Sequence, residues 1–205
     1  MISGEQALQR LREGNRRFVE DRPEHLVNTS RERRRQLTGG QEPFAIILGC
    51  SDSRVPAELV FDQGLGDLFV VRVAGNVAAS SQIGSIEFAA SHFGTRLVVV
   101  LGHSCCGAVK ATLEALRVPA SDDPSHVGSI VNRIAPAVQP LIDQGERADQ
   151  EAVLEEAVQA NVLATVQSLQ EESPILQRLA RDDGLLVVGA EYHLDSGEVT
   201  LLEPR

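Results

Sequence analysis

The sequence of 205 residues contains no tryptophan and only one tyrosine, one methionine and six phenylalanines. It also lacks any apolar run near the ~20 residues that a membrane-spanning helix requires, so we expect no membrane partner. Its first residues, Met1 to Glu5, show no basic segment followed by an apolar one, which would mark a secretory signal. The expected location is therefore the cytoplasm.

Cysteine is also scarce, with three residues at positions 50, 105 and 106. The number is odd and two of the three are adjacent, which argues against a disulfide framework, because neighbouring cysteines close a disulfide only with strain. Free thiols fit a reducing compartment and remain able to hold a metal ion. Cys105 is expected to be a packed thiol.

The net charge of −10 is unevenly distributed: residues 1–40 carry nine arginines against six acidic residues, a net of +3, and the remainder carries −13. The arginine cluster at 31–35 is interrupted by Glu32 and has no aromatic residue beside it. The cluster therefore favours a solvated helix face or a subunit contact, and we expect no nucleic-acid partner.

Continuous apolar runs give the main fold signal. Such runs are typical of strands that are buried on both faces of a parallel sheet, and they occur at 44–48, 68–71, 97–101 and 185–188. A fifth strand is expected at 198–202, where the turn residues 195–197 predict an antiparallel edge strand. Helix-like segments separate the runs, so we predict an α/β fold with a mainly parallel four-stranded sheet, an antiparallel fifth edge strand and flanking helices. The expected helices are 56–62, 81–93, 107–117, a long stretch near 126–170, and 174–181.

Two helices are expected before the first strand. Residues 4–20 place apolar side chains at roughly helical spacing, and a second short helix over 30–38 should stop at Gly39-Gly40. We therefore expect residues 1–40 to form an N-terminal helical arm. Residues 41–205 should form the α/β core, and we expect the chain to be a single domain overall.

Possible metal ligands follow two of the apolar runs. His103 and Cys106 lie three residues apart, a spacing that lets one loop direct both side chains at one ion, and Cys50 supplies a third ligand. Two thiolates and an imidazole suit zinc, and three protein ligands leave a tetrahedral ion one open position, as in catalytic sites. Cysteines after buried strands are otherwise small core residues. A carboxylate, Asp52, and a guanidinium, Arg54, close to Cys50 favour the metal site.

These segments also carry a family resemblance. Cys50-Ser-Asp-Ser-Arg54, followed by Gly102-His-Ser-Cys-Cys-Gly107, resembles the zinc signature of the β-class carbonic anhydrases. The resemblance implies one Zn²⁺ per chain on Cys50, His103 and Cys106, and a catalytic pair of Asp52 and Arg54. It also implies a four-stranded parallel sheet with a fifth antiparallel strand. By the same resemblance, the helical arm of residues 1–40 serves oligomerisation into a homodimer or tetramer, and residues 41–205 form the zinc-binding catalytic domain. The implied activity is the reversible hydration of CO₂ to bicarbonate and a proton by a zinc-bound hydroxide.

Three further positions resemble the substrate pocket of the plant-type members of this family. Gln41 matches a glutamine that reaches across the dimer, and Phe69 matches an apolar residue of the pocket wall. Phe88 stands where those members carry tyrosine, so a hydroxyl is missing here.

Two alternative functions remain open from the sequence. A relative with the same zinc site hydrolyses CS₂ or COS, which are linear like CO₂. The chain could also be a non-catalytic structural-zinc or redox protein, in which Asp52 closes the site as a fourth ligand.

Overall fold

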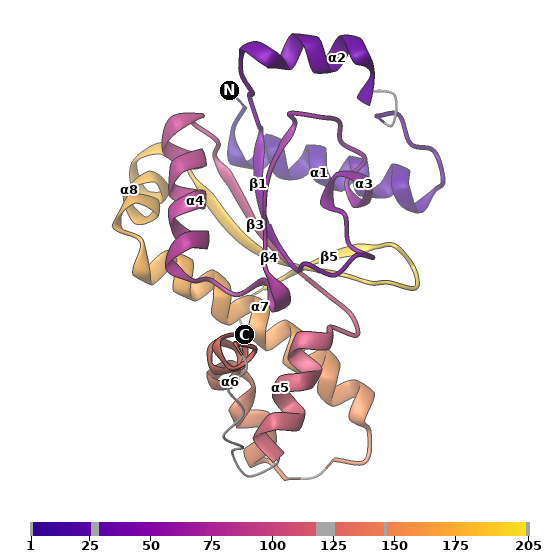
Figure 1. Cartoon of the computed structure of the whole chain (residues 1–205), viewed down its shortest axis with the longest axis vertical. Helices are drawn as coiled ribbons and strands as arrows, with labels where there is room; N and C mark the ends of the chain where they lie inside the picture. The colour runs from indigo at the N-terminus through magenta and orange to yellow at the C-terminus, as the bar shows by residue number, and fades with distance from the viewer. Residues whose placement is uncertain (1, 26–28, 118–125, 146, 204–205) are drawn as a thin grey trace.

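The computed structural model describes residues 2–25, 29–117, 126–145 and 147–203. Five strands form one sheet in the order β2-β1-β3-β4-β5 (Figure 1). The first four strands are parallel, and β5 pairs with β4 in the antiparallel sense. This architecture confirms the predicted fold class. The strands are β1 (Ala45–Gly49), β2 (Leu68–Arg72), β3 (Leu97–His103), β4 (Leu186–Tyr192) and β5 (Val199–Leu202).

The positions of β1 and β3 in the sheet indicate where a ligand can bind. Every residue of these two strands is buried, as their continuous apolar runs predicted. The chain leaves β1 toward β2 on one side, and β3 pairs on the other side, so the strand order reverses between β1 and β3. In open α/β sheets, ligands bind beyond the carboxyl ends of the strands at such a point.

Helices cover both faces of the sheet and extend past its carboxyl edge (Figure 1). The α-helices are α1 (Gly4–Val19), α2 (Arg31–Gln36), α3 (Ala57–Val60), α4 (Ser80–His92), α5 (Gly107–Arg117), α6 (Gly128–Asp143), α7 (Gln150–Glu172) and α8 (Pro174–Asp183). Two 3₁₀ turns, η2 (Leu37–Gly39) and η3 (Ala74–Asn76), complete the described elements.

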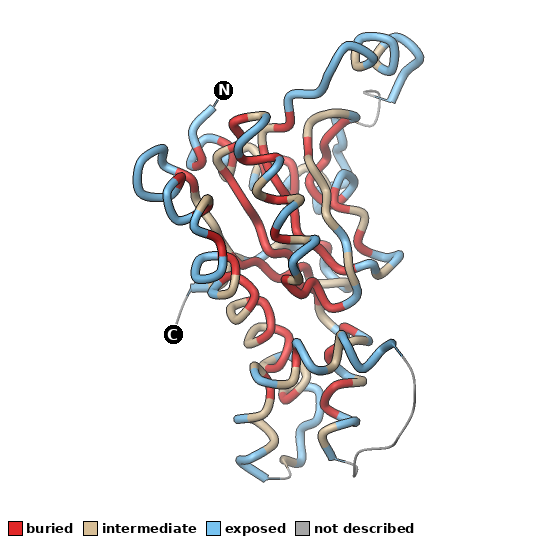
Figure 2. The backbone as a smooth tube through the Cα atoms, turned by 60° about the vertical axis from the view of Figure 1, so that its left-hand side comes forward, coloured by how far each residue is buried: buried red, intermediate tan, exposed pale blue. Residues whose placement is uncertain are grey.

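Alternate side chains of the strands pack into two separate core layers, because successive residues of a strand point to opposite faces. Ile46 and Leu48 of β1 pack with α4, α7 and α8. Ile47 packs on the other face with α1 and α3. A third apolar cluster lies among α5, α6 and α7 beyond the carboxyl edge of the sheet and includes Cys50 and Cys106. Figure 2 shows the buried residues, in red, along the strands and on the helices that pack against them.

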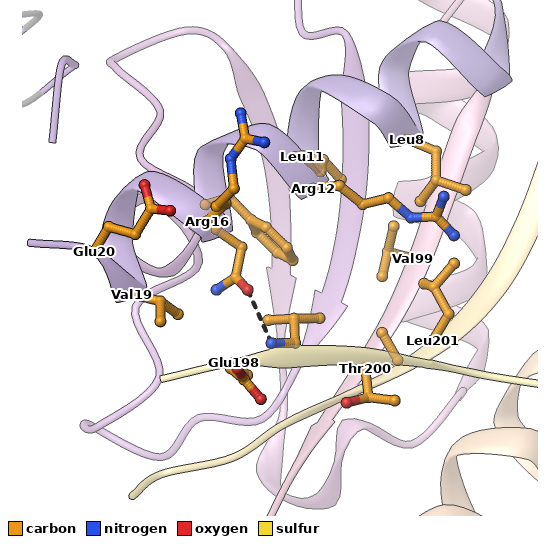
Figure 3. Close-up of a pocket in the computed structure, with 14 residues that line it drawn as sticks. Leu8, Leu11, Arg12, Arg16, Val19, Glu20, Val99, Glu198, Thr200 and Leu201 are labelled. Carbon is orange, nitrogen blue, oxygen red and sulfur yellow. Dashed lines mark hydrogen bonds between the residues drawn. The ribbon is translucent and has the colours of Figure 1, made fainter. Parts of the chain in front are cut away.

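Helix α1 packs on the sheet of its own chain. Ala7 and Leu11 are almost fully buried there, and Gly14 lies so close to the backbone of Phe61 that a Cβ atom would come within 1.9 Å of its carbonyl oxygen. Asn15 donates to the carbonyls of Val60 and Gly197 and accepts from the amide of Val199 at 2.9 Å (Figure 3). Much of the apolar side of the 4–20 segment is thus covered by the chain itself.

Helix α2, by contrast, contains no buried residue and stands apart from the sheet (Figures 1 and 2). Its tether to the body is Arg33, which donates to the carbonyl of Leu65 at 3.0 Å and to the carboxylate of Asp67 at 3.4 Å. A helix of six residues is too short to be stable in water by itself. Of the expected arm, α2 is therefore the part that the rest of the described chain leaves uncovered.

The long helical stretch expected near 126–170 is two helices. Helix α6 ends at Asp143, and Gly145 then adopts a φ of +88°, in the left-handed region that favours glycine. Helix α7 begins after Asp149, whose carboxylate accepts a hydrogen bond from the amide of Ala152 at 3.0 Å. The expected helix at 56–62 is also shorter, Ala57–Val60. None of the described helices is long and apolar enough to cross a membrane.

Candidate metal centre and active site

Cys50, His103 and Cys106 come together beyond the carboxyl ends of β1 and β3. Cys50 directly follows β1, His103 is the last residue of β3, and Cys106 directly precedes α5. Their possible ligand atoms lie within 4.8 Å of one another, and all three residues are buried. Fifty-three residues separate Cys50 from His103 in sequence, yet adjacent parallel strands end side by side and bring them to one place.

The orientation of His103 fits metal binding. Its Nδ1 lies 2.9 Å from the carbonyl oxygen of Ser104, and because a carbonyl only accepts, Nδ1 carries the proton. The other ring nitrogen, Nε2, is buried and has no hydrogen-bond partner among the described residues. A buried polar atom without a partner is costly, so the lone pair of Nε2 is suited to a metal ion. Ser104 is itself fixed, since its hydroxyl accepts from the amide of Leu194 at 3.0 Å.

The two thiols of the cluster interact with each other. A hydrogen bond between Cys106 and Cys50 lowers the pKa of Cys50 and raises the pKa of Cys106. The amide of Gly75 also donates to the sulfur of Cys50, at 3.3 Å. One thiolate is therefore already favoured at neutral pH, and a dication would favour the second, because metal ligation requires deprotonated cysteine. The donor set thus fits a soft divalent metal.

Asp52 and Arg54 form an ion pair at the rim of this cluster. The guanidinium donates from Nε to Oδ1 at 2.9 Å and from Nη2 to Oδ2 at 2.7 Å, and the Arg54 amide adds a third bond to Oδ1 at 3.0 Å. These bonds hold the pKa of Asp52 well below its ordinary value, so the carboxylate is ionised at neutral pH.

Arg72 holds the loop that carries Cys50 and Asp52, a contact that sequence reasoning missed. From the end of β2 it donates to the carbonyl oxygen of Cys50 at 2.8 Å and to that of Asp52 at 2.6 Å. The Gly75 amide described above was missed as well. Both contacts involve backbone atoms, which every residue possesses, so no side-chain pattern could indicate them.

Cys105 is exposed, and the expectation of a packed thiol was wrong. It adopts a φ of +57° in the tight turn between His103 and Cys106. His103 and Cys106 contribute to the cluster, and Cys105 is left on the outside of the turn.

The three expected pocket residues lie away from the metal cluster of their own chain. Gln41 precedes β1 while Cys50 follows it, and five strand residues of about 3.3 Å each separate the two. Phe69 on β2 and Phe88 on α4 lie together, with ring centroids 6.4 Å apart, and Phe88 is 51% exposed. Phe93 contacts both rings. An aromatic cluster thus faces outward beside the edge strand β2.

A cavity of about 450 Å³ between α1 and β5 is a separate feature (Figure 3). Apolar side chains from both elements line it, including Leu8, Leu11 and Leu201, and Arg12 lies at its rim. No residue of the metal cluster lines this cavity, so it is not the site described here.

Comparison with known proteins gives a consistent result. Residues 45–199 match the family described as carbonic anhydrase. Carbonic anhydrase 2 of Mycobacterium tuberculosis is 43% identical over 191 residues, which cover 93% of this chain and 89% of the relative. The β-carbonic anhydrase CafA of Aspergillus fumigatus matches the fold with a TM-score of 0.75 and 25% identity, over 98% of this chain and 92% of that one. A tetrameric β-carbonic anhydrase of Sordaria macrospora shares the fold with a TM-score of 0.72 and 23% identity, over 98% and 96% of the two chains.

The chain belongs to the β-class carbonic anhydrase family. It is a carbonate dehydratase, a lyase that catalyses the reversible hydration of CO₂ to bicarbonate and a proton. These findings favour neither CS₂ or COS hydrolysis nor a non-catalytic structural-zinc or redox role.

Proposed function

We propose that the resident metal is Zn²⁺, one ion per chain, held by Cys50, His103 and Cys106, and that CO₂ hydration takes place at this centre. The observation that carries the proposal is the convergence of two sulfurs and one imidazole nitrogen within 4.8 Å. Sulfur and nitrogen donors in this ratio suit zinc, and three protein ligands leave one coordination position for reactants. When bound, zinc acts as a Lewis acid that makes water nucleophilic near neutral pH.

The roles of Asp52 and Arg54 follow from their geometry. The ionised Asp52 carboxylate lies beside the metal cluster and is a hydrogen-bond acceptor for the water that reacts with CO₂. Accepting that hydrogen bond fixes the direction of the water's lone pair. Arg54 keeps Asp52 ionised and oriented, because a bidentate guanidinium–carboxylate pair defines the plane of the carboxylate. While Asp52 is bound to Arg54, the carboxylate does not close the metal site as a fourth ligand.

The substrate pocket is completed, in this proposal, by a second subunit in a homodimer or tetramer. Gln41, Phe69 and Phe88 lie too far along the sheet or too far outward to enclose the metal cluster of their own chain. The exposed aromatic cluster and the unburied helix α2 are surfaces that a second copy could cover. The tetrameric assembly named for the Sordaria macrospora relative supports this arrangement. We also propose a cytoplasmic location, which the three free thiols support.

The test is a stopped-flow CO₂ hydration assay on the purified protein, with zinc measured per chain by elemental analysis. We expect rapid hydration that tracks zinc content, is lost on dialysis against a chelator and returns when zinc is added. Hydration that is independent of zinc content would refute the proposal. CS₂ and COS are assayed in parallel, and turnover of either at a rate above that of CO₂ would favour the alternative substrate.

A further inference from the structure

One buried hydrogen-bonded chain connects helix α7 to the metal cluster. Asn161 lies in the middle of α7 and is 2% exposed. Its Nδ2 donates to the carbonyl oxygen of Gly75 at 2.8 Å, and the amide of the same Gly75 donates to the sulfur of Cys50 at 3.3 Å. One glycine thus accepts from the helix and donates to a ligand sulfur.

The surroundings of Gly75 explain why this residue needs such support. Its φ of +70° lies in the left-handed region, and a Cβ atom there would come within 2.7 Å of Ile134 and 3.2 Å of Ala108. Glycine is therefore the residue that fits, but it also has the widest backbone freedom. A hydrogen bond that fixes its carbonyl restricts the rotation that would turn its amide away from the sulfur.

The side-chain amide of Asn161 is a polar group among buried apolar neighbours on α7. Ala157, Val158 and Val162 are buried and apolar on the same helix. A polar side chain buried among such residues is unfavourable unless it is hydrogen-bonded, and leucine or alanine would form the helix more readily. The bond to Gly75 is the compensating interaction that the structure provides.

We infer that Asn161 is a positioning residue that keeps the Gly75 amide directed at the Cys50 sulfur. This inference rests on the proposed role of Cys50 as a zinc ligand. An N–H donor withdraws electron density from a thiolate, so the sulfur becomes a weaker donor to the metal and the metal a stronger Lewis acid. Two thiolates otherwise neutralise the charge of a divalent ion, and this hydrogen bond offsets part of that effect.

The test replaces zinc with Co²⁺ and measures the sulfur-to-cobalt charge-transfer absorption of the unaltered protein and of Asn161→Leu. Loss of the donor should raise the energy of the sulfur electrons, so the band should move to longer wavelength. Zinc affinity, measured by competition with a chromophoric chelator, should fall about ten- to a hundredfold, as is typical for partners of metal ligands, because the Cys50 sulfur is then no longer held in place before the metal binds, and this loss outweighs the gain in donor strength. Asn161→Ser, whose hydroxyl is too short to reach Gly75, should give the same shift and serves if the leucine variant does not fold.

Thr165→Val is the matched control, because Thr165 is buried one turn further along α7 and its replacement also exchanges a polar group for an apolar one. Its cobalt spectrum and zinc affinity should equal those of the unaltered protein. If the Asn161 variants bind one Co²⁺ per chain with an unshifted band, or shift no more than Thr165→Val, the inference is overturned. If the unaltered protein binds no Co²⁺ or Zn²⁺, the proposed ligand set fails, and the role of Asn161 fails with it.

Discussion

The Oδ2 atom of Asp52 lies 3.8 Å from Nε2 of His103. The same oxygen is 2.7 Å from the guanidinium of Arg54. Arg54 is not part of the metal cluster, and it holds the Asp52 carboxylate beside that cluster. Asp52 can therefore contact a reactant at the cluster while its charge stays compensated. A substitution at Asp52 should therefore lower turnover while metal binding is retained.

Replacing Asp52 with asparagine should preserve zinc content and lower the hydration rate. An amide has almost the same shape, but it cannot reproduce the carboxylate acceptor, and the expected loss is about a hundredfold or more in kcat. Stopped-flow kinetics and elemental analysis on the same preparation measure both quantities. An unchanged kcat would show that Asp52 is not catalytic.

The three metal ligands should behave differently from Asp52. Cys50→Ser, His103→Ala and Cys106→Ser should each lose most of the zinc, because three donors cannot be reduced to two without a large loss of affinity. Cys105→Ser is the matched control, since Cys105 is exposed and lies outside the cluster, and its zinc content should be unchanged. Full zinc retention in the three ligand variants would contradict the assignment.

Asp62 should make folding stability depend on pH. Its carboxylate accepts from the guanidinium of Arg17 and from the amides of Glu24 and His25. Burial alone would raise the pKa of Asp62, but these donors outweigh burial and lower the pKa from 3.8 to about 2. Because the pKa is lower in the folded state, the stabilisation is present above about pH 4 and is lost as the pH falls toward 2.

Asp62→Asn tests this dependence. It should lower stability at pH 7 by roughly 1.5–3 kcal/mol, the usual range for hydrogen bonds to a charged group. Thermal unfolding of both proteins at pH 7 and near pH 3 measures the difference, which should shrink at the lower pH. A difference that stays constant between the two values would show that the charge of Asp62 is unimportant.

Alanine substitution at two helix glycines should change the folding stability in opposite directions. Gly14 of α1 has the carbonyl of Phe61 where a Cβ atom would lie, so Gly14→Ala must push α1 off the sheet and should cost roughly 1–3 kcal/mol. Gly84 of α4 has open space around it, so Gly84→Ala should stabilise the protein by about 0.5–1 kcal/mol through helix propensity. Chemical denaturation measures both. Equal effects at the two positions would argue against close packing of α1.

Assembly can be tested through complementation between two defective subunits. If Gln41 serves the pocket of a partner subunit, Gln41→Ala and Cys50→Ser should each lower activity alone. A mixed dimer would pair the intact zinc ligands of one subunit with the intact Gln41 of the other, restoring one of its two sites and about half of the activity. Sedimentation at the assay concentration should show a dimer or larger species. A fully active monomer, or no recovery on mixing, would refute the shared pocket.

The strands were predictable from the sequence because burial on both faces requires continuous apolar residues, as in Val98-Val99-Val100. The break between α6 and α7 was not, because the turn at Gly145 interrupts a stretch that is helix-like on both sides. The covering surface for α1 was also not predictable. An amphipathic pattern shows that a helix has an apolar side, but it does not show whether that side meets its own chain or another.

The sequence by itself determined the chemistry of the site. Cysteine, histidine, aspartate and arginine have fixed donor types, and their spacing after two strands was enough to indicate a metal centre with a carboxylate beside it. Tertiary structure alone decided how those groups are held. The guanidinium of Arg72 donates to backbone carbonyls of the Cys50 loop, and the backbone amide of Gly75 donates to the Cys50 sulfur. Asn161, 86 residues from Gly75 in sequence, donates to the carbonyl of Gly75. Backbone donors and acceptors are the same in every residue, so only the fold selects which of them meet.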